Sequence, residues 1–208
     1  RLSVNQIKEV SIIDLLERNE VALNEKLIKK YIFGKRILIT GAGGSIGSEL
    51  VRQCIKYEPA LLVMLDNSEY NLFQIEKEVL EKQSNVLTKP ILTNIRDHDI
   101  LSKVFTEYEP QIIFHAAAYK HVSMQEAFPW EAVETNVHGT INLVNLSLQH
   151  TVEKFVLVST DKAVKPINVM GATKRLAELI CQGADENCKT NFMAVRFGNV
   201  LGSTGSVI

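Results

Sequence analysis

The sequence has little of several features that would each point to a particular class of protein. It contains only 3 cysteines, and Cys54, Cys181 and Cys188 form no Cys-x-x-Cys pair. This spacing supports neither a disulfide framework nor a zinc site, so we expect reduced thiols half-buried in the helices of a cytosolic protein. No pair among the 5 histidines has a metal-site spacing with carboxylate or cysteine support, and we expect no metal.

Charge of one sign and long apolar runs are also missing. The 23 basic and 24 acidic residues give a formal net charge of -1, so the chain has no cationic field that would attract nucleic acid or anionic lipid. We find no run of about 18 apolar residues and expect neither a membrane span nor a signal peptide in this chain. What is present is a 46% apolar composition, enough to bury a sizeable core.

The patterning divides the 208 residues into a lead-in and one larger domain. Residues 11–17 and 24–33 have the spacing of two short amphipathic helices. In the second, Leu27, Ile28 and Tyr31 share one stripe, and Gly34 is placed to end the helix. We therefore expect residues 1–34 to form a helical lead-in packed on the edge of a domain that spans residues 35–208.

From residue 35 onward, short β-branched runs alternate with longer segments of helical spacing. The predicted strands are residues 36–40, 61–66, 86–92, 112–115, 154–159 and 192–196. The predicted helices are residues 45–57, 69–83, 97–108, 130–149 and 169–187. Continuous apolar strands separated by helices predict an α/β fold, a doubly wound parallel sheet of Rossmann type covered on both faces. Pro90 interrupts the third strand, which is unusual inside a sheet.

A glycine-rich turn, TGAGGSIG, follows the first predicted strand and opens the first helix. Gly41 permits the tight turn, Gly44 lets the backbone approach a pyrophosphate, and Gly47 lets the helix lie close to the sheet. The helix start, with Ser45 and Ile46, offers N–H groups and a positive dipole end to phosphates. The turn in this context predicts a dinucleotide-binding site.

Residues at the ends of the next strands are expected to complete this site. Asp66 ends the second strand, where a carboxylate accepts hydrogen bonds from ribose hydroxyls and repels a 2′-phosphate; this favours NAD and leaves NADP open. The alternative is that Asp66 caps the helix that begins near Ser68. Asp97 is equally consistent with a contact to adenine and with a helix N-cap. The other expected cofactor contacts here are Asn67, Ile95, Ala116, Ala117 and Ala118.

Three longer stretches resemble a known family. Residues 115–122 read HAAAYKHV, residues 158–174 read VSTDKAVKPINVMGATK, and residues 196–207 read RFGNVLGSTGSV. Together with the glycine turn they resemble the nucleotide-sugar 4,6-dehydratases of bacterial surface-polysaccharide and protein-glycosylation pathways, within the extended short-chain dehydrogenase/reductases. In particular they resemble the large membrane-associated branch of this group.

One departure from the superfamily pattern supports this branch. The superfamily carries a Tyr-x-x-x-Lys pair in which the lysine lowers the pKa of a tyrosine base. Here the pair is Met170 and Lys174, and the large membrane-associated dehydratases share the methionine. The base at the sugar C4 hydroxyl stays open, with Thr160 as the best remaining hydroxyl. The alternative for Met170 is plain core packing.

The resemblance implies an NAD-dependent UDP-N-acetylglucosamine 4,6-dehydratase, which oxidises C4, eliminates water across C5–C6 and returns hydride to C6. It implies that Asp161 is the acid at the C6 hydroxyl, Lys162 a desolvated base at C5, and Lys174 a partner of the nicotinamide ribose. His115 is expected in the wall of the cofactor pocket. The residues implied to face the sugar nucleotide are Lys120, His121, Asn136 and Asn199. For Asn136, ordering the loop that bears Thr160 is the alternative.

Two other functions stay open, a UDP-sugar epimerase of the same superfamily and a non-catalytic dinucleotide sensor that has lost its tyrosine. The resemblance also implies a transmembrane region before residues 1–34 and a substrate lobe after residues 202–207. We therefore expect a cytoplasmic piece of a membrane protein, truncated before the substrate lobe, that makes no membrane contact itself, binds NAD and turns over slowly. Related enzymes pair through helices resembling residues 130–149 and 169–187, which implies a homo-oligomer.

Overall fold

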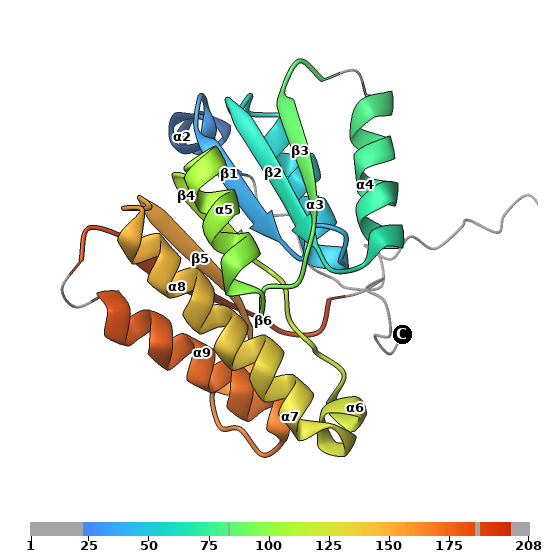
Figure 1. The fold of residues 1–208 in the computed structure, drawn as a ribbon, viewed down its shortest axis with the longest axis vertical. Coiled ribbons are helices and arrows are strands. Elements are labelled where there is room, and N and C mark those ends of the chain that lie inside the picture. Colours follow the sequence, from blue (N-terminus) through green and yellow to red (C-terminus); the bar gives the residue numbers. More distant parts are fainter. Residues whose placement is uncertain (1–22, 83, 186–187, 201–208) are drawn as a thin grey trace, which may run out of the picture.

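A six-stranded parallel sheet forms the centre of the protein (Figure 1). The computed structural model describes residues 23–82, 84–185 and 188–200. The strands are β1 (Arg36–Thr40), β2 (Leu61–Asp66), β3 (Leu87–Leu92), β4 (Ile112–His115), β5 (Lys154–Thr160) and β6 (Asn191–Phe197). Their order is β3-β2-β1-β4-β5-β6, which reverses direction between β1 and β4. This is the doubly wound Rossmann arrangement that the sequence predicts.

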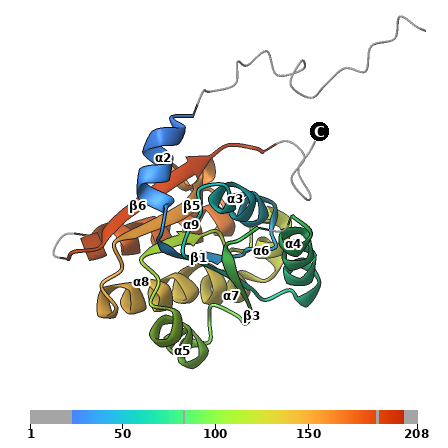
Figure 2. The same cartoon turned by 90° about the horizontal axis from the view of Figure 1, so that it is seen from above.

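Helices cover both faces of the sheet, as Figure 2 shows. One layer contains α2 (Glu25–Ile32), α3 (Ser45–Ile55) and α4 (Glu69–Glu81), and the other contains α5 (His98–Tyr108), α8 (Gly139–Gln149) and α9 (Val169–Asp185). Strand β2 shows why two layers form. Leu61, Val63 and Leu65 belong to the core under α5, α8 and α9, whereas Leu62 and Met64 belong to the core under α2, α3 and α4. Alternate side chains of one buried strand thus pack into the two cores on opposite faces of the sheet.

The predicted helix over residues 130–149 is wrong in one respect, because it is three elements. Helix α7 (Pro129–Ala132) leads into a π-helix, η2 (Val133–His138), and then into α8. The wider turn is visible in the bond from the Gly139 N–H to the Glu134 carbonyl, five residues back. The remaining short elements are α6 (Val122–Ala127) and the 3-10 helix η3 (Asp161–Ala163).

Strand β3 does form despite Pro90, and its place in the sheet explains this. It is an edge strand that pairs only with β2, with Pro90 opposite Met64. An edge strand tolerates a residue without an N–H group because one side of its backbone has no neighbour to bond.

The described part of the lead-in is α2, while the predicted helix over residues 11–17 lies outside the described residues. The Asn24 side chain caps α2 by accepting a hydrogen bond from the Leu27 N–H at 3.1 Å, and Gly34 follows the helix with a φ of +67°. The predicted stripe is only partly right. Ile28 packs against the core, but Leu27 and Tyr31 are about half exposed, and Ile32 is the buried residue instead.

Three helix-to-strand returns contain a non-glycine residue in the left-handed region. Glu58 comes before β2, Glu109 before β4 and Thr151 before β5, with φ values of +54°, +41° and +50°. All three returns lie at the amino end of the sheet, because each delivers the chain to the first residue of a parallel strand.

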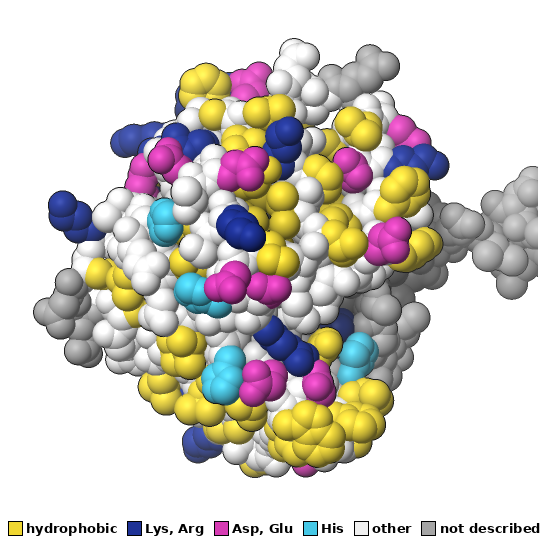
Figure 3. All heavy atoms as spheres, in the orientation of Figure 1, with side chains coloured by type: hydrophobic (Ala, Val, Ile, Leu, Met, Phe, Trp, Pro, Cys, Tyr) yellow, Lys and Arg dark blue, Asp and Glu magenta, His cyan; other side chains and the backbone are white. Residues whose placement is uncertain are grey.

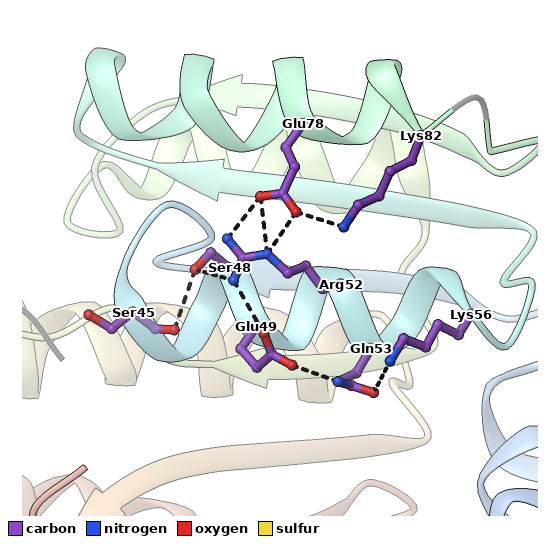
Figure 4. A network of polar contacts seen from close by, with 8 residues as sticks. All are labelled: Ser45, Ser48, Glu49, Arg52, Gln53, Lys56, Glu78 and Lys82. Carbon is purple, nitrogen blue, oxygen red and sulfur yellow. Dashed lines mark hydrogen bonds and ion pairs between the residues drawn. The ribbon is translucent and has the colours of Figure 1, made fainter. Parts of the chain in front are cut away.

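Helices α3 and α4 are joined by an ion-pair network, drawn in Figure 4. The Arg52 guanidinium donates to Glu78 from Nε at 2.8 Å and from Nη2 at 2.8 Å, and Glu78 also accepts from Lys82 at 2.7 Å. These bonds hold the pKa of Glu78 down, at about 2. The network fixes α3, and with it the glycine turn, against α4.

Candidate functional site

The glycine turn has the geometry that its sequence predicts. Gly41 has a φ of +69°, and a Cβ added there would lie 2.6 Å from the Ala117 backbone nitrogen. A Cβ added at Gly47 would overlap the Gly41 carbonyl oxygen, so the first turn of α3 rests directly on the loop. Helix α3 begins at Ser45 and Ile46, and its N-cap residue, Gly44, provides no capping side chain. Such a helix start fits a phosphate.

Asp66 holds this turn in place. Its Oδ2 accepts a hydrogen bond from the Gly43 N–H at 2.8 Å and its Oδ1 accepts one from the Ser68 N–H at 2.9 Å. The cap of α4 is Ser68, whose hydroxyl accepts from the Asn71 N–H, so the alternative role of Asp66 as that cap is wrong. The carboxylate is 6% exposed and lies at the end of β2, beside the turn.

A cavity of about 170 Å³ lies at the carboxyl ends of β1 to β4. The predicted cofactor residues that line it are Gly41, Gly44, Asp66, Asn67, Ile95, Ala116, Ala117 and Ala118. Lining residues that the sequence reasoning missed are Leu65, Ser68, Asn71, Thr93, Asn94, Tyr119 and Thr135. Four strand ends thus contribute to one cavity, which is where parallel α/β sheets bind ligands.

The contact predicted for Asp97 is not found in this cavity. Asp97 is exposed and caps α5, where its Oδ1 accepts a hydrogen bond from the Ile100 N–H at 3.1 Å. Asn94, three residues earlier, lines the cavity in its place. Both residues are short and polar and follow the same strand, so the sequence alone could not separate the cap from the cavity residue.

Arg96 connects the segments around the cavity and was not predicted. Its Nε and Nη2 donate to the Thr135 hydroxyl at 3.0 and 2.7 Å, and Nη2 also pairs with Glu131. The guanidinium lies 5.9 Å from the centre of the Tyr119 ring. Since Thr135 and Tyr119 line the cavity, Arg96 ties its wall together.

Asn136 corrects a prediction, because it is buried and does not face a substrate. Its Oδ1 accepts from the Tyr119 N–H at 2.8 Å, and its Nδ2 donates to the Tyr119 carbonyl at 3.0 Å and to the Thr173 hydroxyl at 3.1 Å. It therefore orders the segment after β4 and the start of α9, and not the loop that bears Thr160. Asn136 makes these contacts from inside the π-helix, an element that is often found at functional sites.

His115 is likewise not in the wall of the cavity. The ring is 1% exposed and lies between the Thr40 and Thr140 hydroxyls, at 2.7 Å from Nδ1 and 3.0 Å from Nε2. Burial, with a smaller contribution from the Lys174 charge, lowers the pKa of His115 to about 3, so the ring is neutral. It is a core histidine.

Met170 and Lys174 lie one helical turn apart on the buried side of α9, 5% and 6% exposed. None of the described residues forms a hydrogen bond with the Lys174 ammonium. Burial lowers the pKa of Lys174 to about 8, although Cys181 and Glu178 act in the opposite direction. A lysine as buried as Lys174 with no hydrogen-bond partner among the described residues is unusual, because such a group normally is paired. It fits a ligand that brings hydroxyl oxygens, such as a ribose.

Thr160 ends β5, and Asp161 and Lys162 follow it next to α9. Gly171 allows this approach, since a Cβ there would lie 2.6 Å from the Lys162 carbonyl oxygen. The predicted states of the pair are wrong for the chain as described. Lys162 is not desolvated, with a side chain 38% exposed, and it lies 3.2 Å from Asp161. Hydrogen bonds from Lys162 and Thr160 lower the pKa of Asp161, so this carboxyl is ionised.

The residues predicted on the sugar side fall into two groups. Asn199 accepts a hydrogen bond from the Lys162 ammonium at 3.3 Å, which joins the loops after β5 and β6. Lys120 and His121 are exposed after β4, at the same edge of the sheet. The loop over residues 202–206 lies outside the described residues.

The cysteines partly match their prediction. All three thiols are free; Cys54 and Cys181 are buried in α3 and α9, but Cys188 is exposed before β6. Within the described ranges, no group of three or more His, Cys, Asp or Glu side chains is placed to hold a metal ion. Figure 3 shows acidic and basic side chains interspersed on the face drawn.

The sheet order, the glycine turn and the cavity at the carboxyl edge define a Rossmann-like domain of the extended short-chain dehydrogenase/reductase kind. The chain belongs to the polysaccharide biosynthesis protein family, whose model matches residues 37–208. It is 46% identical over 209 residues to the capsular polysaccharide biosynthesis protein CapD of Staphylococcus aureus, covering 100% of this chain and 35% of that protein.

Two further similarities agree with this family. Over 179 residues the chain is 34% identical to an inverting UDP-N-acetylglucosamine 4,6-dehydratase of Campylobacter jejuni, covering 84% of this chain and 52% of that enzyme. The X-ray structure of Pen from Bacillus thuringiensis matches with a TM-score of 0.79 and 34% identity, covering 85% of this chain and 54% of that one. The chain thus spans about a third to a half of the length of these relatives. In the part of the chain that the structure describes, no helix is long and apolar enough to cross a membrane.

Proposed function

We propose that the protein is an NAD-dependent dehydratase that eliminates water from a UDP-N-acetylhexosamine in bacterial surface-polysaccharide biosynthesis. The observation that carries the proposal is the buried Lys174 ammonium, which has no partner among the described residues and lies on α9 next to the Asp161–Lys162 pair. Similarity to a UDP-N-acetylglucosamine 4,6-dehydratase makes UDP-N-acetylglucosamine the first substrate to test.

The cavity and Lys174 would hold the cofactor. NAD, when bound, supplies the acceptor for the C4 hydride and its return to C6. Asp66, at the end of β2, would accept hydrogen bonds from the adenosine ribose hydroxyls, and its negative charge disfavours the 2′-phosphate of NADP. The Lys174 ammonium would donate to the nicotinamide ribose. This donation would offset the cost of burying a charge that has no hydrogen-bond partner among the described residues.

The Asp161–Lys162 pair would supply the acid and the base of the elimination. In the described state Asp161 is ionised, whereas an acid at the C6 hydroxyl needs a proton on Asp161 and a base at C5 needs a neutral Lys162. A sugar that covers the pair excludes water, and burial disfavours both charged forms, so Lys162 would release its proton to solvent as the sugar binds. Asp161 would gain its proton when the C4 hydroxyl is oxidised. Lys162 takes the C5 proton, Asp161 protonates the departing hydroxyl, and water leaves.

The C4 hydroxyl needs a separate route for its proton. The buried Met170 cannot accept one, and Thr160 is the proposed relay. Its hydroxyl donates to the Asp161 carboxylate at 3.0 Å, so a proton that reaches Thr160 has an acceptor beside it.

The test is turnover of UDP-N-acetylglucosamine by the longest natural form of the protein with NAD, followed by mass spectrometry. Loss of one water supports the proposal. An unchanged mass with inverted C4 indicates an epimerase, and bound NAD with no product indicates a dinucleotide sensor; either result rejects it. Asp161→Asn and Lys162→Ala are expected to lower turnover by roughly 10²- to 10⁴-fold with NAD affinity retained. The matched control is Lys165→Ala, an exposed lysine of the same segment that should turn over normally.

We further propose that residues 1–34 and 35–208 act as lead-in and domain, that the protein works in the cytoplasm, and that copies associate through α8 and α9. Leu148, Leu176 and Leu179 on these helices are 37–48% exposed, which supports an interface there. Figure 3 also shows hydrophobic side chains gathered over α6 and α7, where Met124, Phe128 and Trp130 are exposed.

A further inference from the structure

Glu178 is a buried carboxylate on α9, one helical turn beyond Lys174 and 6% exposed. Its Oε1 accepts hydrogen bonds from the Ser159 hydroxyl at 2.6 Å and from Arg196 Nε at 2.8 Å. Its Oε2 accepts from Arg196 Nη2 at 2.7 Å and from Arg175 Nη1 at 2.9 Å. One side chain of α9 thereby binds both β5 and β6.

The two strand residues that Glu178 binds are direct neighbours in the sheet. Ser159 of β5 lies opposite Arg196 of β6 in the parallel register, at the carboxyl end of both strands. The chain continues from Ser159 into the loop of Lys162, and from Arg196 into the loop of Asn199. These two loops meet in the 3.3 Å hydrogen bond between Lys162 and Asn199. Glu178 fastens both loops at their base.

Glu178 also carries a negative charge four residues from Lys174 on α9, and this charge favours the ammonium form of the lysine. The other titratable groups that interact with this lysine are His115 of β4 and Cys181 of α9, and burial keeps both neutral near pH 7. The remaining charged groups on the elements packed against α9 are partly exposed and screened by water; they are Glu126, Glu131, Glu134, His138, Lys154, Asp161, Lys162 and Arg196.

We propose that Glu178 is a positioning residue of the candidate site, which fastens the carboxyl ends of β5 and β6 and keeps Lys174 in its ammonium form. The purpose of that ammonium, to bind a nicotinamide ribose, rests on the proposed function; the electrostatic coupling between the two side chains does not. The sequence shows Lys174 and Glu178 only as two residues four apart on a helix, and two of the partners of Glu178, Ser159 and Arg196, come from strands that are distant in sequence.

Two substitutions test the electrostatic coupling between Glu178 and Lys174: one removes a negative charge and the other removes a positive charge. Glu178→Gln removes the carboxylate and leaves its two guanidinium partners uncompensated, so the Lys174 titration midpoint should fall by roughly one pH unit. Arg196→Gln removes a guanidinium and leaves the carboxylate, so the midpoint should rise. Both are measured by NMR titration of ¹³C-labelled lysine, with the Lys174 signal assigned through Lys174→Arg.

The matched control is Glu153→Gln. Glu153 is another ion-paired carboxylate, bound to Lys35 at 2.7 Å, but it lies just before the first residue of β5, at the opposite end of the sheet. Its substitution should leave the Lys174 midpoint unchanged. A midpoint that is also unchanged in Glu178→Gln, or one that moves the same way in Glu178→Gln and Arg196→Gln, overturns the proposal. Should Glu178→Gln fail to fold, the direction of the shift in Arg196→Gln decides alone.

NAD affinity as a function of pH provides the second readout. Glu178→Gln should lose NAD affinity at a lower pH than the unsubstituted chain, by the same interval as the shift in the NMR titration. Absence of NAD binding in the unsubstituted chain, together with opposite NMR shifts in the two variants, rejects the proposed function and leaves the role of Glu178 standing.

Discussion

The cofactor turn depends on the absence of a Cβ atom at Gly47. The first turn of α3 rests on the Gly41 carbonyl, and any Cβ at Gly47 overlaps that oxygen. The oxygen belongs to backbone that is itself held close to Ala117, so it has little room to move. The helix start and the turn therefore cannot accept even the smallest side chain without displacing one another.

We expect Gly47→Ala to destabilise the protein by about 1–3 kcal/mol, because overpacking a rigid contact forces the backbone to shift. The displaced helix start should also weaken NAD binding at least roughly tenfold, a change of about 1.4 kcal/mol. Urea unfolding and NAD titration measure the two effects.

The control is Gly183→Ala in α9, where a Cβ would meet nothing within 4 Å. This change should leave NAD binding alone and stabilise the helix by up to about 1 kcal/mol. Equal urea midpoints for the two variants would show that the contact at Gly47 is not tight.

At the scale of single residues, the sequence predicts those whose role depends on near neighbours. Gly41 and Gly47 are identified by a turn between adjacent elements, and both positions are confirmed. Arg96 was missed because the side chains that it hydrogen-bonds lie 35 or more residues away. Glu178 was missed because its hydrogen-bond partners on the strands lie 18 or more residues away, and only Arg175 is near it on α9. Asp97 was ambiguous for a different reason, since an N-cap and a ligand contact use the same side chain.

The π-helix η2 is the element whose shape depends most on one side chain. Asn136 makes its three hydrogen bonds to Tyr119 and Thr173 from inside this element while 1% exposed. In a regular α-helix the side chain would point in another direction and the Tyr119 segment would lose its support.

We expect Asn136→Ala to cost about 1–3 kcal/mol of stability, because it removes the partner of the Tyr119 N–H and carbonyl and one hydrogen bond to Thr173. It should also weaken NAD binding, since Tyr119 lines the cavity. Thermal unfolding and NAD titration measure both. Glu134→Gln, an exposed change in the same element, should be nearly neutral; similar losses in both variants would argue against a special role for Asn136.

At the scale of elements, apolar periodicity locates nearly every helix and strand, to within a few residues. It does not locate the break in residues 130–149, because a single π-turn shifts the apolar pattern by only about one residue and its Asn136 side chain bonds distant segments. The same limit of apolar periodicity explains why the buried face of α2 was predicted only in part. Periodicity groups Leu27, Ile28 and Tyr31 on one stripe, but the angle at which the helix meets the sheet buries Ile32.

For the molecule as a whole, the buried neutral His115 makes stability depend on pH. Its folded pKa, about 3, lies below the ordinary value of about 6.5 in an unfolded chain, so the unfolded chain binds more protons between these limits. The contribution of His115 to stability is therefore complete above pH 6.5 and declines as the pH falls toward 3.

We expect the free energy of unfolding to fall by up to about 1.4 kcal/mol per pH unit below pH 6.5. The window between pH 6.5 and 5 isolates His115, because the Glu178 carboxylate, with its pKa lowered to about 2, loses its contribution only below about 4.3. His115→Gln should be less stable at pH 7 but flatter across this window. The control His98→Gln, whose side chain is 52% exposed, should keep the slope; a slope retained in His115→Gln would contradict the assignment.

The arrangement of the whole sheet is the part that the sequence predicts best, because alternating strands and helices with right-handed connections leave few topologies. The reaction is the part that it predicts least, since the protonation of Asp161 and Lys162 depends on what covers them.

The three left-handed returns at Glu58, Glu109 and Thr151 have a consequence for how such a chain can change. They lie at the amino end of the sheet, whereas the glycine turn, Lys174 and the Asp161 loop lie at or near its carboxyl end. Substitutions at Glu58, Glu109 or Thr151 that fit the left-handed backbone better can therefore occur without disturbing the candidate site. The amino end of the sheet can therefore accept substitutions that change the stability of the fold, while the carboxyl end keeps the residues of the candidate site.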